Sequence, residues 1–242
     1  MTELEIALQE LTQKEFPVEV VQELKSGKEA KVFIVEAAAD QKLYALKVYH
    51  NFLTRAFGTQ KHYLEDRYIG SENSSSRRAV QKGNLYGRTL MQSTWVMREQ
   101  YFLKKIGDQT EYMPKMIKGL SNGVLMEFIG DETGPAPRLS EVKLPEERIE
   151  EVVTICLDLI ELFLQNGIVH GDFSPFNILW WNNKPYVIDF PQAVDIRESK
   201  RVYSLLKRDI RNIMHPYNYD DELVEELTVE MLERNGMPVI DG

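Results

Sequence analysis

Cysteine is almost absent from this sequence. Cys156 is the single cysteine among 242 residues, which excludes an internal disulfide, and it lies in an apolar run with helical spacing. We therefore expect a small buried side chain and a reducing compartment. No apolar run approaches the roughly 20 residues that span a bilayer, and residues 1–10 carry acids but no apolar signal-peptide core. These absences predict a cytoplasmic protein without a membrane partner.

Basic residues are also fewer than acidic residues. The chain has 29 Lys and Arg against 38 Asp and Glu, and the net charge of -9 argues against direct DNA binding by the whole surface. The distribution is uneven, because residues 50–105 contain ten basic and four acidic residues, whereas residues 220–234 contain seven acidic residues and one basic residue. The stretch 50–93 is too long for a connection. It is either a solvated loop or, through its basic and aromatic side chains, a contact for RNA or an acidic partner.

Two acids and an amide occur at a spacing typical of phosphoryl transfer. Asn177 follows Asp172 by five positions, and Asp189 follows Asn177 by twelve. At this spacing the first Asp orients the attacking hydroxyl and accepts its proton, while the Asn and the second Asp hold the magnesium ions that bridge the phosphates of ATP. The pattern predicts Asp172 as a catalytic residue and Asn177 and Asp189 as metal ligands.

The segments around this loop have the order that such a site requires. Apolar residues from Ile149 to Phe163 recur every three or four positions, which predicts a helix that begins near Pro145 and stops at Asn166-Gly167. Short strands are predicted at residues 168–169, 177–180 and 186–188, with a turn at 182–183. A helical run is expected over 197–214, and an acidic helix over 220–234.

The N-terminal half is predicted to hold the nucleotide. Strands are expected at residues 18–24, 32–35 and 43–49, with a turn at 26–30. Lys47 stands in the third strand in the apolar-apolar-lysine form that neutralises the α- and β-phosphates. Glu99, in a helix predicted over 94–106, is the expected partner of Lys47. The alternative for Glu99 is a surface pair with Arg98 or Lys104.

A second hairpin leads to the junction of the two halves. Strands are expected at residues 116–120 and 124–130, joined by Asn122-Gly123, which is a strong hairpin signal. The backbone carbonyl of Glu127 and the amide of Ile129 are the candidates for recognising the edge of adenine. Met126, beside them, is either part of this site or a core side chain.

Three stretches resemble the RIO family of atypical serine/threonine protein kinases: residues 26–33, 126–139 and 170–194. The resemblance implies an α+β, bilobal protein-kinase-like fold, with a small β-rich lobe over 1–126, a flexible insert at about 50–93, and a helical lobe over 127–242. An activation loop and peptide-docking helices are missing from the pattern. There is no room for a winged-helix domain before residue 18, which favours the branch of the family without one.

The resemblance also implies ATP and Mg2+, with Mn2+ as a substitute, and it assigns the site residues. Lys47, Asp172 and Asp189 are the catalytic set, with Asp189 also a candidate acceptor of an aspartyl phosphate. The nucleotide contacts are Ser26, Gly27, Lys28, Glu29, Ala30, Val32, Lys47, Glu99, Met126, Glu127 and Ile129.

Four functions remain open from the sequence. The first is a serine kinase that phosphorylates itself or another protein. The second is an ATPase that controls association with a precursor of the small ribosomal subunit. The third is a small-molecule kinase of the aminoglycoside or choline type, which shares the His-Gly-Asp, Asn and Ile-Asp-Phe elements. The fourth, a noncatalytic scaffold, is disfavoured because every catalytic position is occupied.

Overall fold

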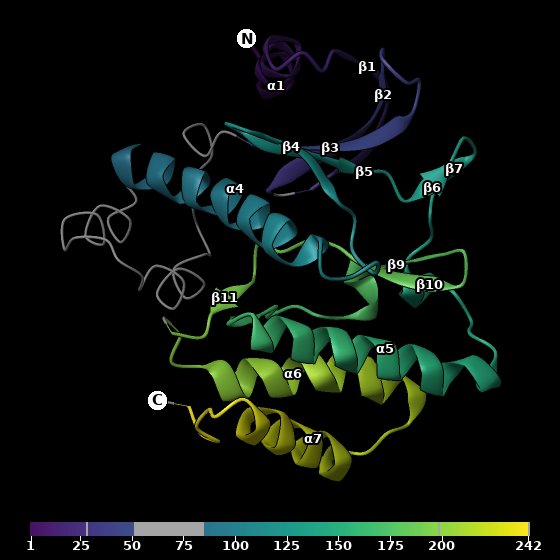
Figure 1. Ribbon diagram of the computed structural model, residues 1–242, viewed down its shortest axis with the longest axis vertical. Coiled ribbons are helices and arrows are strands. Elements are labelled where there is room, and N and C mark those ends of the chain that lie inside the picture. Colours follow the sequence, from purple (N-terminus) through teal and green to yellow (C-terminus); the bar gives the residue numbers. More distant parts are fainter. Residues whose placement is uncertain (28, 51–84, 198, 242) are drawn as a thin grey trace. The chain divides into compact units, whose positions relative to one another are not determined.

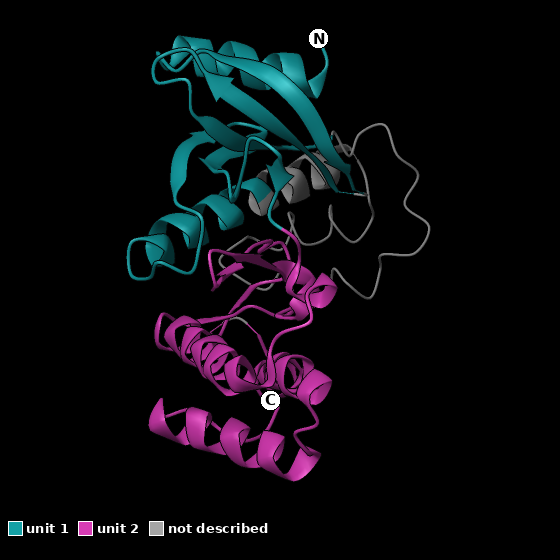
Figure 2. Ribbon diagram, turned by 90° about the vertical axis from the view of Figure 1, so that its right-hand side faces the viewer, with its two compact units in different colours: residues 1–60, 72–136 teal, residues 61–71, 137–242 magenta. Residues whose placement is uncertain are grey.

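The structure is a computed structural model that describes residues 1–27, 29–50, 85–197 and 199–241 (Figure 1). Most of the predicted insert, and Lys28 of the predicted phosphate turn, lie outside these residues. The described residues form two compact units, of which unit 1 extends to Ala136 and unit 2 begins at Pro137 (Figure 2). None of the helices in the described ranges has the length and apolar content needed to cross a bilayer.

Unit 1 is built on a five-stranded antiparallel sheet in the order β1-β2-β3-β5-β4. Its strands are β1 (Val18–Ser26), β2 (Ala30–Ala37), β3 (Leu43–Tyr49), β4 (Met116–Leu120) and β5 (Gly123–Glu127). Each strand predicted for this sheet has a counterpart, and the predicted hairpin between β4 and β5 is confirmed. Its two-residue turn is Ser121-Asn122 and not Asn122-Gly123, because Leu120 pairs with Gly123. Glycine is required at 123, since a Cβ there would lie 2.3 Å from the backbone oxygen of Lys47.

The strand predicted over residues 124–130 was too long. It ends at Glu127, and the chain then forms a separate ribbon of β6 (Gly130–Asp131) and β7 (Gly134–Pro135). Gly130 has φ of 150°, and a Cβ on it would lie 2.4 Å from the carbonyl oxygen of Gly134. Residues with a Cβ rarely adopt this conformation, so the approach of β6 to β7 at this point requires glycine.

Helices cover both faces of this sheet (Figure 1). On one face, Ala7 and Leu11 of α1 (Glu3–Gln13) pack with the apolar side chains Phe33, Val35, Leu46, Val48, Leu120 and Leu125. Sequence reasoning missed α1, although Thr2 and Glu5 form a capping box in which each side chain accepts from the other's backbone nitrogen. On the other face, Val96 of α4 (Leu85–Gly107) contacts Ala30 and Tyr49.

The start of α4 was predicted too late in the chain. The helix begins at Leu85 and not at Thr94, so residues 85–93 of the predicted insert are helical. Leu, Met, Arg and Gln dominate this stretch, and their helix propensity outweighs the cost of Gly87 and Ser93.

Unit 2 consists largely of α5 (Glu146–Gln165), α6 (Val202–Met214) and α7 (Asp221–Arg234). The helix predicted from near Pro145 to Asn166-Gly167 is confirmed as α5, which buries Val152, Cys156, Leu159 and Phe163. It ends at Gln165, with Asn166 as its C-cap, and Gly167 follows with φ of 77°. Burial raises the pKa of the Cys156 thiol to about 12, as expected of an inert core side chain.

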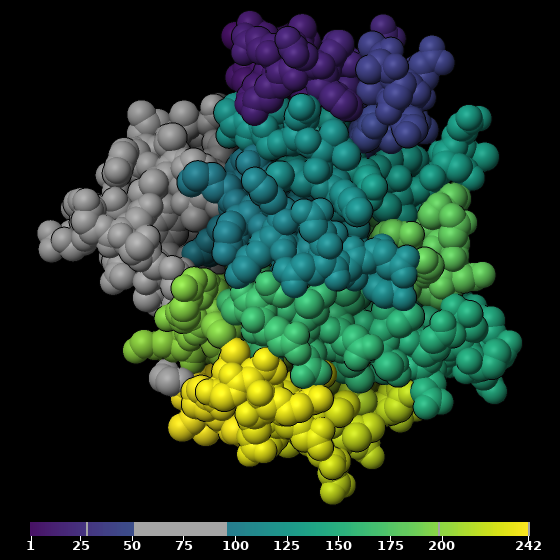
Figure 3. Space-filling view, viewed as in Figure 1, coloured from purple at the N-terminus to yellow at the C-terminus, as the bar shows by residue number. Residues whose placement is uncertain are grey.

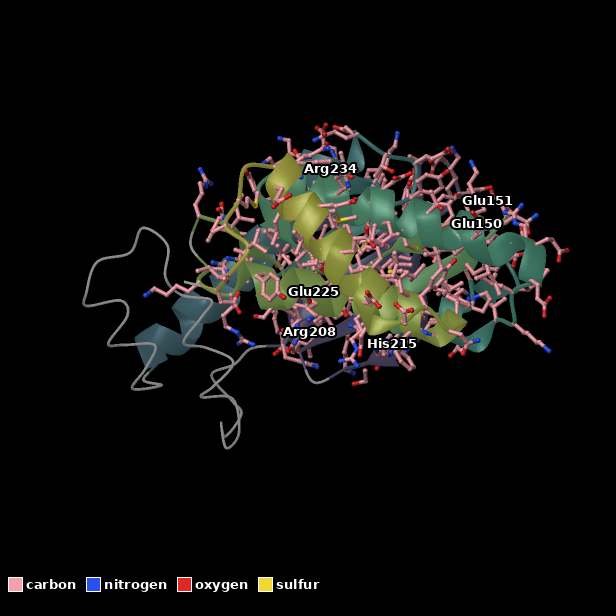
Figure 4. The ribbon with its side chains drawn as sticks, turned by 90° about the horizontal axis from the view of Figure 1, so that it is seen from below. Glu150, Glu151, Arg208, His215, Glu225 and Arg234 are labelled. Atoms are coloured by element: carbon pink, nitrogen blue, oxygen red, sulfur yellow. The ribbon has the colours of Figure 1, made fainter. Side chains whose placement is uncertain are left out.

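The helical run predicted from Arg197 begins only at Val202. The Asp195 side chain accepts a hydrogen bond from the backbone nitrogen of Arg197 at 2.9 Å, and this local turn competes with the helix. Helix α7 packs on α6 and forms an outer surface of unit 2, drawn in yellow in Figure 3. Glu225 of α7 pairs there with Lys207 of α6, and His215, at the end of α6, lies 2.9 Å from Asp221 (Figure 4).

Candidate active site

The loop that carries Asp172 leaves β8 (Ile168–Val169) through a glycine that no other residue replaces easily. Gly171 has φ of 73°, and a Cβ on it would lie 2.7 Å from the carbonyl oxygen of Gln192. The segment with Gln192 returns to β8 as β11 (Val194–Asp195), and the two strands pair antiparallel. Asp172 itself is exposed, whereas Gly171 and Phe173 on either side of it are buried.

Helix α6 binds this loop through the buried carboxylate of Asp209. Asp209 accepts a hydrogen bond from the backbone nitrogen of Gly171 at 2.7 Å and another from that of Phe173 at 3.0 Å. Arg208, labelled in Figure 4, donates to the carbonyl oxygen of Gly171. The backbone on both sides of Asp172 is therefore fixed by two consecutive residues of α6.

Asp209 was not predicted as a site residue. Its side chain is 1% exposed, and burial raises its pKa to about 7 although the two backbone N–H groups and Arg208 act in the opposite direction. The available signal was a charged Arg208-Asp209 pair within a helix whose neighbours at 205, 206, 210 and 213 are apolar. An acid on such a face needs a polar partner inside the fold.

Asn177 binds the loop as well. It closes the short helix η3 (Pro175–Asn177), and its side-chain nitrogen donates to the backbone oxygen and to the carboxylate of Asp172, both at 2.9 Å. An amide that donates through its nitrogen keeps its oxygen as the atom for a cation.

A hairpin brings Asp189 to the same place. Strands β9 (Ile178–Trp181) and β10 (Lys184–Val187) pair with Ile178 opposite Val187. The backbone nitrogen of Ile188 donates to the backbone carbonyl oxygen of Asn177 at 2.9 Å. The predicted turn is confirmed, since Asn182 and Asn183 have φ of 49° and 59°, as a two-residue hairpin requires. Asn177 and Asp189 thus lie at the same end of the hairpin.

Asp189 has an unusual backbone conformation. Its φ is 73°, which costs a residue with a Cβ about 1 kcal/mol or more. The following residue, Phe190, anchors the strained segment: it is 1% exposed, and its ring lies 4.9 Å from that of His170 and 5.8 Å from that of Phe163. Packing of Phe190 thus sets the position of Asp189.

In unit 1, Lys47 and Glu99 form the predicted ion pair. The Lys47 Nζ lies 2.6 Å from Glu99 Oε1, and the residues are 7% and 1% exposed. The surface alternative for Glu99 was wrong. Sequence reasoning missed a third member, because the Tyr49 hydroxyl donates to Glu99 Oε2 and its ring centroid lies 5.3 Å from Lys47 Nζ.

The predicted phosphate turn lies between β1 and β2 in the same unit. The Gly27 nitrogen donates to the Ala30 oxygen at 2.9 Å, and the His50 ring nitrogen lies 3.1 Å from the Gly27 carbonyl oxygen. A carbonyl only accepts, so His50 Nε2 carries a hydrogen. Val32 lies opposite Lys47 in the β2–β3 register. Ser26 is the last residue of β1, and Glu29 immediately precedes β2.

The predicted adenine contacts lie at the end of β5. Met126 and Ile129 are each 9% exposed, and the Ile129 carbonyl oxygen accepts from the nitrogen of Ala136 at 2.9 Å. The Glu127 carboxylate accepts from the backbone nitrogen of Lys115 at 3.0 Å, so this side chain is bound to the residue that precedes β4. Recognition of adenine by residues 127 and 129 stays a prediction.

The donor set in unit 2 fits magnesium. Within the described ranges, no three His, Cys, Asp or Glu side chains gather as an all-protein metal cage. Mg2+ does not need one, because it usually binds through one or two carboxylates, substrate phosphates and water. The carboxylate of Asp189 and the amide oxygen of Asn177 satisfy that requirement.

Comparisons with known proteins identify the family of this chain. A family model described as RIO domain matches residues 31–223. A RIO-type serine/threonine-protein kinase Rio1 of Thermoplasma acidophilum is 28% identical over 180 residues, which cover 74% of this chain and 87% of that protein. The human serine/threonine-protein kinase RIO1 is 28% identical over 191 residues, which cover 78% of this chain and 32% of that protein. The chain thus spans about a third of the human relative's length.

Among solved structures, the chain is similar to the crystal structure of the Rio2 kinase-ADP/Mg2+-phosphoaspartate complex from Chaetomium thermophilum. The TM-score is 0.63 at 17% sequence identity, and the match covers 98% of this chain and 72% of that one. The predicted α+β kinase-like fold is confirmed by this likeness together with the antiparallel sheet of unit 1 and the helices of unit 2.

Proposed function

Since this chain belongs to the RIO domain family, we propose that it transfers the γ-phosphoryl group of ATP, with Mg2+, to a serine or threonine hydroxyl of a protein substrate or of itself. The observation that carries this proposal is that hydrogen bonds fix both the backbone around Asp172 and its carboxylate. Its flanking amides are bound by Asp209 and its carboxylate by Asn177, while the side chain is exposed. A carboxylate held in one position and open to solvent is suited to accept a proton from an incoming hydroxyl.

Asn177 and Asp189 are the proposed Mg2+ ligands. The ion, when bound, neutralises the charge that develops on the phosphates. The role of this chain's residues is to hold both ligands at one end of the β9–β10 hairpin, where the Asn177 amide nitrogen is occupied by Asp172. Mn2+ has the same preference for oxygen ligands and is the proposed substitute.

Unit 1 supplies the proposed nucleotide contacts. Lys47, oriented by Glu99, places a positive charge for the α- and β-phosphates. The turn over residues 26–30 is proposed to contact the phosphates through the Ser26 hydroxyl and the Lys28 side chain, while Val32 and Met126 offer apolar contacts. The Glu127 carbonyl and the Ile129 amide are proposed to bind the edge of adenine. The proposed boundary between the two lobes lies between residues 126 and 127.

A second outcome of the same chemistry is an aspartyl phosphate on Asp189. The related Rio2 structure is described as a complex with ADP, Mg2+ and phosphoaspartate, which supports an aspartate acceptor in this chain as well. Hydrolysis of that phosphate makes the protein an ATPase. Control of a small-ribosomal-subunit precursor by such an ATPase, and a cytoplasmic location, are proposed from the resemblance alone. The aminoglycoside or choline kinase alternative is disfavoured, because the RIO domain match spans both units.

The test is phosphoryl transfer by the purified chain with Mg2+ and γ-labelled ATP. We expect acid-stable label on serine or threonine, and Asp172→Ala should reduce its rate by about 100-fold or more. The matched control is Asp158→Ala, which removes an exposed aspartate of α5 and should leave the rate unchanged. Label that is labile to hydroxylamine and absent from Asp189→Asn would assign the aspartyl phosphate. A rate unaffected by Asp172→Ala contradicts the proposed role.

A further inference from the structure

Tyr49 occupies the far side of the carboxylate that holds Lys47. Its hydroxyl donates to Glu99 Oε2, and the other oxygen, Oε1, lies 2.6 Å from Lys47 Nζ. We propose that Tyr49 is a positioning residue that keeps Glu99 aligned on Lys47 before a nucleotide binds. Its consequence for catalysis rests on the proposed function.

The strand register brings the three groups together. Residues 47 and 49 lie on the same face of β3, because side chains alternate along a strand. The intervening Val48 points to the opposite face, where it belongs to the cluster with α1. Glu99 approaches from α4, so one helix residue meets two strand residues.

The hydrogen bond from Tyr49 to Glu99 is important because both side chains are buried. Glu99 and Tyr49 are each 1% exposed, and Lys47 is 7% exposed. A buried carboxylate needs hydrogen bonds to both oxygens, since water cannot replace a missing donor. With a donor on each oxygen, rotation of the Glu99 carboxylate breaks one of them. The Tyr49 hydroxyl therefore restricts the rotation that would move Oε1 away from Lys47.

Tyr49 also packs between two parts of unit 1. Its ring contacts Val96 of α4 and Ala30, which is the first residue of β2 after the predicted phosphate turn. A role in packing alone predicts that removal of the hydroxyl changes little. The Tyr49→Phe substitution separates the two roles, because it keeps the ring and removes only the oxygen.

The first measurement needs no nucleotide. Hydrogen exchange of the Lys47 ammonium group, followed by NMR on protein with 15N-labelled lysine, reports how firmly the group is held. We expect the exchange to be about tenfold faster in Tyr49→Phe, as loss of a charged hydrogen bond predicts. Equal exchange rates in the two proteins would overturn the proposal.

The second measurement is kcat/KM for ATP, which we expect to fall about tenfold in Tyr49→Phe. In a Glu99→Ala background the same substitution should have an effect below about twofold, because Tyr49 acts through Glu99. A full tenfold effect in that background contradicts the mechanism. Should Glu99→Ala fail to fold, the exchange measurement on the single variant still decides.

The matched control is Tyr44→Phe, on the same strand. The Tyr44 hydroxyl also donates to a carboxylate, that of Asp40 at 2.9 Å, but this pair is exposed and outside the site. Tyr44→Phe should leave Lys47 exchange and kcat/KM unchanged. If the wild-type chain transfers no phosphate, the proposed function fails, whereas the exchange measurement still tests Tyr49.

Discussion

The carboxylate of Asp209 lies 2.7 Å from the backbone nitrogen of Gly171, the residue immediately before the proposed catalytic aspartate. The two residues are 38 positions apart in the chain, and Asp209 is buried in the middle of α6. The position of the loop therefore depends on a helix that is far from it along the chain. A loop held in this way keeps Asp172 in place without a bound substrate.

Replacement of Asp209 by alanine should damage both stability and activity. Two buried N–H groups lose their acceptor, so we expect the free energy of unfolding to fall by about 3 kcal/mol. The rate of phosphoryl transfer should fall as well, because Asp172 is no longer fixed. Chemical denaturation and the transfer assay measure the two effects. Asp158→Ala, on the surface of α5, serves as the control, and an equal effect of both substitutions would contradict this role for Asp209.

The stability contributed by Asp209 should depend on pH. Burial raises its pKa from 3.8 to about 7, so the folded protein binds a proton more tightly than the unfolded chain. The sign follows from linkage: this contribution is largest at the acidic end and declines as the pH rises from about 4 to about 7. Denaturation of the wild type and of Asp209→Asn across this range isolates the effect. As the pH rises, the unfolding free energy of the wild type should fall relative to that of Asp209→Asn. A difference that does not change with pH would contradict a raised pKa of Asp209.

Lys47→Met should abolish phosphoryl transfer and destabilise unit 1. It leaves the Glu99 carboxylate buried without its cation, which costs about 3–5 kcal/mol. The double variant with Glu99→Gln removes the buried charge, and we expect it to regain most of the stability but none of the activity. Lys31→Met is the control: its pair with Glu23, at 3.0 Å, is exposed and should be worth less than about 1 kcal/mol. Restored activity in the double variant would contradict the phosphate role of Lys47.

Gly171→Ala should be more harmful than an alanine at another glycine of similar backbone conformation. Gly171 and Gly236 have φ of 73° and 65°, but only at Gly171 does an added Cβ meet a backbone atom, the Gln192 oxygen at 2.7 Å. Gly236→Ala should cost about 1–2 kcal/mol from φ alone. Gly171→Ala adds a steric cost of about 1–3 kcal/mol and should displace Asp172, lowering activity. Equal midpoint temperatures of thermal denaturation for the two variants would show that the loop accommodates the methyl group.

Several elements were predictable because their signals are local. Residues within one element account for the apolar period of α5, the β4–β5 hairpin, the Asn182-Asn183 turn and β3. The errors also have local causes. Helix α1 was missed although its capping box is visible in the sequence, and α4 begins nine residues earlier than predicted because its first turns are rich in helix-forming residues.

The sequence alone determined the reaction class, since the spacing of Asp172, Asn177 and Asp189 and the strand position of Lys47 can be read without coordinates. Only the tertiary structure decided what holds these groups. Asp209 meets Gly171 across 38 positions, and Tyr49 meets Glu99 across 50. The sequence marks Asp209 as an acid on an apolar helix face, but it does not indicate the partner in either contact, because each depends on the packing of a helix against a distant strand or loop. The physical reason is burial: a charged side chain inside the fold takes whichever donors the packing places beside it.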